Sequence, residues 1–218
     1  MSTLLIVGAG PRLGGAIARC FGRAGYDIAL VSEDEASVAA LGIALQAEGF
    51  TTGWTVANVV DDADLRAAIT RFADHTGGID VAIHNVSVWH EANALELAPE
   101  QLLADVHAGA ASLLTIAQAC APSMIAAGHG TIIATGSASA DTPSKGAPSL
   151  GVQKGALRAL VQGIAPDLAA QGIHCATITI NGTLGSSPAF DPARIAETYL
   201  EIVNEPREQW RTVVPYNG

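Results

Sequence analysis

The chain has 218 residues, of which 49% are hydrophobic and 15% are charged, and this balance excludes a disordered, heavily solvated protein. A formal net charge of −10 argues against a protein that wraps nucleic acid or docks on anionic lipid. The length suits one α/β domain, so we expect residues 1–218 to form a single unit. Two residue types are scarce: the lysines are Lys145 and Lys154, and the tyrosines are Tyr26, Tyr199 and Tyr216.

Short apolar runs alternate with helical patterns along the whole chain. The runs that predict buried strands are Leu4–Gly8, Asp27–Val31, Thr51–Val56, Val81–His84, Thr131–Thr135 and Cys175–Ile180. The stretches that predict helices are Gly14–Gly25, Glu35–Glu48, Asp61–Thr76, Pro99–Ala127 and Gly151–Ala170, with a last helix, Pro192–Asn204, and a short strand near Arg211–Pro215 after them. This alternation predicts an α/β fold with a doubly wound parallel sheet and helices on both faces, a Rossmann-type single domain. A ligand then binds at the carboxyl ends of the strands.

Glycine marks the ends of the predicted helices. The five positions where a helix C-terminus favours positive φ are Gly25, Gly49, Gly77, Gly128 and Gly172. Three scattered cysteines, Cys20, Cys120 and Cys175, sit among apolar residues and are expected to be small buried thiols rather than disulfide or metal ligands. No stretch approaches 18 unbroken apolar residues and no basic segment precedes the first strand, so we expect no membrane span and a cytoplasmic location.

The first strand runs into a glycine-rich turn that opens a helix. The turn contains Gly8, Gly10, Arg12, Leu13 and Gly14. Glycine there lets the backbone approach a pyrophosphate, and the helix N-terminus supplies free N–H groups and partial positive charge. This context predicts dinucleotide binding, the alternative being a plain tight turn.

The end of the second strand bears on the choice of dinucleotide. Ser32 and Glu33 stand where a side chain can accept hydrogen bonds from the adenosine ribose hydroxyls, and a carboxylate there repels a 2′-phosphate, which favours NAD. Arg12 argues for NADP, because a guanidinium beside the pocket can pair with a phosphate. We expect NAD or NADP, with NAD slightly preferred.

The layout resembles the short-chain dehydrogenase/reductase family over essentially the whole chain. The glycine turn is similar to that of the family, with Arg12 in place of its middle glycine. Asn58-Val59 resembles the family's Asp-Val pair beside the adenine, and His84-Asn85-Val86-Ser87 resembles its Asn-Asn-Ala-Gly. Gly182 follows the sixth strand as in the family's Pro-Gly, and Ser186 falls near its nicotinamide-contacting threonine. The resemblance implies an oxidoreductase that binds NAD(P)(H) and acts on a small carbonyl or alcohol.

The family's chemistry uses a serine, a tyrosine and a lysine four residues after the tyrosine. Ser137 and Lys154 match the serine and lysine, but Leu150 stands at the tyrosine position. The resemblance gives Ser137 the role of steadying the developing charge on oxygen and Lys154 that of holding the cofactor ribose. Between Tyr26 and Tyr199 the chain has no tyrosine, and Tyr199 belongs to a late helix expected to pack outside or to roof the cleft.

Three interpretations of the function therefore stay open. His107 occupies the place of a family asparagine and either replaces the missing acid or is a hydrogen-bonded interior histidine. If no group moves the proton, the protein is a non-catalytic dinucleotide-binding sensor or assembly subunit, and a structural protein without cofactor is the third reading.

The predicted loop after the sixth strand is short and offers little to enclose a substrate. Trp89, His90 and Glu91 are candidates for lining the pocket, with a core or interface role for Trp89 as the alternative. The long Ala-rich helices Pro99–Ala127 and Gly151–Ala170 permit close helix–helix contact, so a homodimer or homotetramer is expected.

Overall fold

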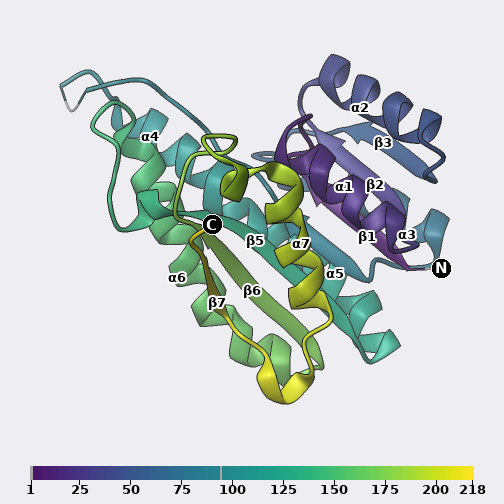
Figure 1. The fold of residues 1–218 in the computed structure, drawn as a ribbon. Coiled ribbons are helices and arrows are strands. Elements are labelled where there is room, and N and C mark those ends of the chain that lie inside the picture. The colour runs from purple at the N-terminus through teal and green to yellow at the C-terminus, as the bar shows by residue number, and fades with distance from the viewer. Residues whose placement is uncertain (1, 94) are drawn as a thin grey trace.

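The computed structural model describes residues 2–93 and 95–218. Its centre is a seven-stranded parallel sheet with the order β3-β2-β1-β4-β5-β6-β7 (Figure 1). The strands are β1 (Thr3–Val7), β2 (Asp27–Ser32), β3 (Thr52–Val56), β4 (Val81–His84), β5 (Gly130–Ser137), β6 (Ile173–Ile180) and β7 (Val213–Tyr216). The order reverses between β1 and β4, and such a switch point opens a crevice at the carboxyl ends of the strands.

Helices cover both faces of the sheet. They are α1 (Leu13–Arg23), α2 (Glu35–Ala47), α3 (Asp62–Thr76), α4 (Pro99–Val106), α5 (Ser112–Ala127), α6 (Pro148–Ala170) and α7 (Pro192–Val203). The face with α1, α2 and α7 packs on one set of strand side chains, Leu4 and Ile6 among them, and the face with α3, α5 and α6 packs on the alternate set, which includes Leu5 and Val7. The predicted doubly wound α/β fold is confirmed.

The glycine prediction is also confirmed at all five helix ends. Each of these residues has φ between 75° and 92°, a region that L side chains rarely adopt: Gly25, Gly49, Gly77, Gly128 and Gly172. Of the three cysteines, Cys120 and Cys175 are buried, which raises the pKa of each thiol to about 12, and Cys20 is half-buried.

Two predicted helices differ in detail. The stretch predicted as Pro99–Ala127 is interrupted by a π-helical turn, His107–Ala111, between α4 and α5. At Gly109 in this turn a Cβ would lie 2.3 Å from Oε1 of Gln153, so the turn brings the backbone against α6. Helix α6 begins at Pro148 rather than Gly151, because a proline is well tolerated in the first turn of a helix.

One helical stretch bears on the expectation of no membrane span. The helical stretch Pro99–Ala127 is long and apolar enough to cross a membrane by length and composition, with a mean hydropathy of 1.5 in its most apolar window. In the structure α5 instead packs against β4, β5 and α3, as a core helix does.

Candidate active site

Two cavities lie along the carboxyl edge of the sheet and share Gly10, Asn85 and Ser87. The first, about 370 Å³, extends from the glycine turn to Ser137 and Lys154. The second, about 320 Å³, extends from the glycine turn to the ends of β2 and β3. Because the shared residues lie at the switch point between β1 and β4, the two cavities form the halves of one cleft.

The glycine turn is fitted closely to the strand beside it. Gly8 has φ of +82°, and a Cβ there would lie 2.8 Å from the backbone carbonyl of Asn85. Helix α1 starts without a side-chain cap and has no acidic residue in its first turn. Its N-terminus therefore faces the cleft with free positive potential, which suits an anionic group.

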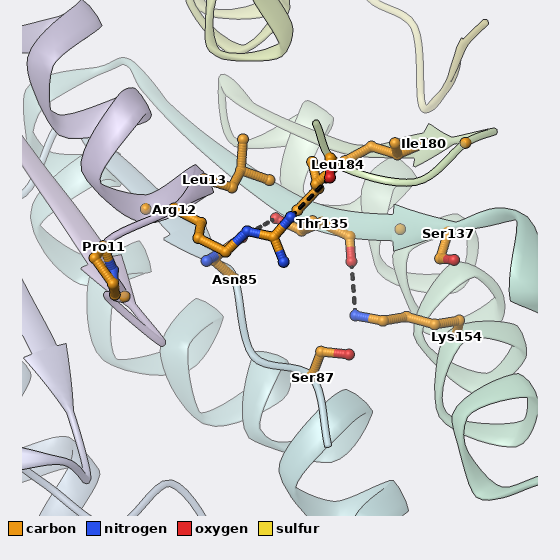
Figure 2. Close-up of a pocket in the computed structure, with 14 residues that line it drawn as sticks. Pro11, Arg12, Leu13, Asn85, Ser87, Thr135, Ser137, Lys154, Ile180 and Leu184 are labelled. Atoms are coloured by element: carbon orange, nitrogen blue, oxygen red, sulfur yellow. Dashed lines mark hydrogen bonds between the residues drawn. The ribbon is translucent and has the colours of Figure 1, made fainter. Parts of the chain in front are cut away.

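Arg12 crosses the first cavity. It immediately precedes α1, and its Nη2 donates a hydrogen bond of 2.7 Å to the carbonyl of Leu184 in the loop after β6 (Figure 2). Its guanidinium thus lies in the half of the cleft that contains Ser137 and Lys154. Glu33 lines the other half, so the suggestion that Arg12 pairs with a phosphate near the end of β2 finds no support in this geometry.

A chain of side-chain hydrogen bonds holds the floor of the cleft. The Asn85 amide donates to the Gly8 carbonyl at 2.9 Å, and its Oδ1 accepts from Thr135 at 2.9 Å. The Thr135 hydroxyl also lies 2.7 Å from the hydroxyl of Tyr199 on α7. Tyr199 is fully buried, and burial raises the pKa of its phenol. The helix that carries Tyr199 packs on the outer face of the sheet beside α1, one of the two placements expected for it, and the Tyr199 hydroxyl reaches inward to Thr135.

Lys154 is 3% exposed and reaches the cleft from within α6. Its Nζ donates to the carbonyl of Thr135 at 2.9 Å (Figure 2). It also donates to the carbonyl of Val86 at 3.0 Å. Burial lowers the pKa of this amine to about 8. An ammonium has three N–H donors, so one remains for a ligand after the two carbonyls are bonded.

Ser137 ends β5 on the same side of the cavity as Lys154 (Figure 2). Its hydroxyl accepts from the backbone N–H of Ser139 at 3.1 Å and lies 3.2 Å from the Ser139 hydroxyl. Leu150 lies one helical turn before Lys154 in α6 and is half-buried. It carries no group that can move a proton.

A buried histidine lies beneath this end of the cleft. His84 ends β4 fully buried, with Nε2 2.9 Å from the Ser112 hydroxyl, which in turn donates to the Ala108 carbonyl. Burial, and secondarily the charge of Lys154, lowers the pKa of His84 to about 3, so the imidazole is neutral at pH 7.

The second cavity contains the polar residues expected beside adenosine. Glu33 and Asp34 are both exposed carboxylates of this cavity, and Asp34 also caps α2 by accepting from Ser37 N–H at 3.0 Å. Asn58 accepts from Val60 N–H at 3.1 Å through its Oδ1, so its amide N–H groups face outward for a ligand. The lining includes all of Ser32, Glu33, Asn58 and Val59.

The structure brings most of the predicted site residues together. Those lining one or both cavities are Gly8, Gly10, Arg12, Leu13, Gly14, Ser32, Glu33, Asn58, Val59, Asn85, Ser137, Lys154 and Gly182. Ser186 is exposed, and neither cavity includes it. The sequence interpretation did not place Ser87, Thr135 or Leu184 in the cleft, although all three follow or end strands at the predicted edge.

His107 lies outside both cavities. It is exposed at the start of the π-helical turn. The interior, hydrogen-bonded alternative for His107 is therefore wrong.

The residues after β4 also differ from expectation. Trp89 is 62% exposed, so a core role is excluded. His90 Nδ1 lies 3.6 Å from the buried Asp105 carboxylate, and neither cavity is lined by Trp89, His90 or Glu91.

The fold and cleft define a Rossmann-type nucleotide-binding protein. The model of the short chain dehydrogenase family matches residues 2–188, and the chain belongs to this family of NAD(P)-binding oxidoreductases.

Individual relatives support the same class. The chain is 30% identical over 165 residues to dehydrogenase/reductase SDR family member 4 of Oryctolagus cuniculus, a match that covers 74% of this chain and 63% of that relative's length. It therefore spans less than two thirds of that protein.

Two solved structures are similar as well. A gluconate 5-dehydrogenase from Burkholderia cenocepacia in complex with NADP and tartrate is 30% identical, with a TM-score of 0.76 and coverage of 87% of this chain and 77% of that one. A metagenomic short-chain oxidoreductase in complex with NADP has a TM-score of 0.88 at 22% identity, covers 98% of this chain and 96% of that one, and supports the fold alone.

Proposed function

We propose that this protein is an NAD(P)(H)-dependent oxidoreductase for a small carbonyl or alcohol, with NAD preferred and with a catalytic set reduced to Ser137 and Lys154. The observation that carries the proposal is the position of these two side chains in the same cavity as the glycine turn. The preference for NAD rests on Glu33, an exposed carboxylate that lines the second cavity.

The residues of the cleft fit a dinucleotide. The uncapped N-terminus of α1 suits a pyrophosphate, and the third donor of Lys154 suits a ribose hydroxyl. The amide N–H groups of Asn58 and the carboxylate of Glu33 suit an adenosine. When bound, the nicotinamide supplies hydride exchange, which no side chain provides.

The chain's own residues then perform the remaining tasks. The Ser137 hydroxyl donates to the substrate oxygen once it turns from Ser139, which stabilises charge as it develops there. Lys154 orients the ribose from its two carbonyl anchors. Because Leu150 has no proton to give, the proton comes from another group or from water, and the loss of a general acid slows turnover by ~10²–10⁴.

The test follows cofactor oxidation with a panel of small aldehydes and ketones. The proposal expects slow turnover that Ser137→Ala reduces further and that Leu150→Tyr raises, because a phenol at that position lies one turn before Lys154. Binding of NADH by calorimetry is measured on each variant as the control. Bound NADH with no turnover across the panel, in both the unmodified protein and Leu150→Tyr, would contradict an enzymatic role.

The second candidate is a non-catalytic dinucleotide-binding sensor or assembly subunit. It is favoured by a specific observation. Position 150 is a leucine, and the phenol of the buried Tyr199 does not line the cavity. This candidate predicts a thermal shift with NAD(H) and no hydride exchange.

We also propose a cytoplasmic homodimer or homotetramer. Apolar side chains are exposed on the helices expected to associate, Leu103 on α4, Leu114 and Ile125 on α5, and Val152 on α6. Light scattering of the purified protein tests the assembly, and a monomer at micromolar concentration would overturn it.

A further inference from the structure

Arg12 joins two segments that lie 172 residues apart in the chain. The residue precedes α1 on one side of the first cavity, and its Nη2 bonds to the Leu184 carbonyl on the other side (Figure 2). Both residues line the cavity between them. The guanidinium of this exposed residue therefore bridges the two sides of the cavity.

Arginine at the N-cap position does not stabilise α1. Helices α2, α3 and α7 each begin with an aspartate whose carboxylate accepts backbone N–H groups: Asp34, Asp61 and Asp191. At the N-terminus of α1 the positive charge of Arg12 instead opposes the helix dipole. The cost is offset when an anion lies between the helix end and the guanidinium.

The cavity is suited to such an anion. Its lining contains two cationic side chains, Arg12 and Lys154, and no acidic one, in a chain whose net charge is −10. A guanidinium has five N–H donors. Within residues 2–93 and 95–218, the guanidinium of Arg12 has one hydrogen-bond acceptor, the Leu184 carbonyl. Four donors are thus left for oxygen atoms of a ligand.

The loop that Arg12 reaches is short and internally tied. Gly185 N–H donates to the Phe190 carbonyl at 2.8 Å, and at Gly182 a Cβ would lie 2.3 Å from the Phe190 ring. Such a loop does not fold over a ligand as a long mobile lid does. Closure of this side of the cleft therefore depends on the bond from Arg12.

We propose that Arg12 is a strap that retains the dinucleotide, donating to its pyrophosphate while Nη2 holds the Leu184 carbonyl. The inference rests on the proposed binding of NAD(P)(H). Because the bond to Leu184 must open for the dinucleotide to leave, and the contacts of Arg12 with the pyrophosphate must break with it, we expect the main effect on the dissociation rate.

The experiment measures NADH release by stopped-flow fluorescence. Arg12→Ala is expected to raise the dissociation rate about tenfold to a hundredfold, as when a charge-assisted hydrogen bond to phosphate is lost. Arg12→Lys keeps the charge but has no planar fork, so it restores only part of the effect. Arg194→Ala, an exposed arginine on α7 outside the cavity, is the matched control and leaves the rate unchanged.

Two further measurements separate a strap from a general loss of folding. Arg12→Ala is expected to weaken the binding of ADP-ribose, which carries the pyrophosphate, and to leave the binding of adenosine unchanged. In the NADH complex it also speeds hydrogen exchange of the backbone amides of residues 183–190. A dissociation rate within twofold of the unmodified protein, or equal losses for ADP-ribose and adenosine, would overturn the strap while leaving the proposed function intact. Failure of the unmodified protein to bind NADH would overturn both.

Discussion

The hydroxyl of Tyr199 lies 2.7 Å from the hydroxyl of Thr135, and this contact ties α7 to the end of β5 beneath the cleft. Thr135 in turn bonds to Asn85, which supports the carbonyl of Gly8. The one tyrosine near the site thus supports the glycine turn from inside the core.

Replacing Tyr199 by Phe tests this supporting role. The change removes one buried hydrogen bond and lowers the free energy of unfolding by about 1 kcal/mol. Urea denaturation measures the loss, and NADH turnover measures chemistry in parallel. A collapse of turnover at unchanged stability would show instead that the phenol takes part in the reaction.

Lys154 predicts a pH dependence of dinucleotide binding. The pKa of this buried amine is about 8, so above that pH the neutral form has two N–H groups for its two carbonyls and none for the ribose. The Kd for NADH is expected to rise as the pH passes from 7 to 9. Calorimetry across this range checks it, and Lys154→Met is expected to bind weakly with a flat profile. An equal slope in both proteins would assign the effect to another group.

His84 predicts part of the loss of stability in acid. The folded-state pKa is about 3 against an ordinary 6.5, so between these values the unfolded chain binds a proton that the folded one does not. Stability contributed by the neutral imidazole is therefore present above pH 6.5 and is lost as the pH falls toward 3, with a slope approaching about 1.4 kcal/mol per pH unit.

Urea denaturation of His84→Asn at several pH values isolates this contribution. As the pH falls below 6.5, the unmodified protein should lose more unfolding free energy than the variant, so the variant becomes relatively more stable. A difference that stays constant with pH would exclude His84 as the titrating group.

Glu33 predicts the choice between the two dinucleotides. Replacing it by Gln removes the charge that repels a 2′-phosphate, so the ratio of NADP to NAD affinity is expected to rise about tenfold. Binding of both dinucleotides by calorimetry measures the ratio. Glu35→Gln, in the exposed first turn of α2, is the matched control because the second cavity does not include it. If the ratio rises equally in the control, the effect comes from the change in net charge and not from the position of Glu33.

Local sequence patterns determined much of this protein. Buried apolar runs predicted the parallel sheet, and glycines at helix ends predicted five positions of positive φ, because both depend on residues close in the chain. The glycine turn and the four-residue spacing of Leu150 from Lys154 are likewise local. They were enough to predict where the cleft lies, and they carry the prediction that Leu150 takes the place of the family tyrosine.

Only the tertiary structure decided how the side chains are used. Arg12 meets Leu184 across 172 residues, and the Tyr199 hydroxyl meets that of Thr135 across 64, so no local pattern contains either contact. Nothing in the sequence pattern marks the π-helical turn that begins at the exposed His107. The reduced pKa of Lys154 has the same origin, since burial by packed elements, rather than the identity of neighbouring residues, disfavours its charge.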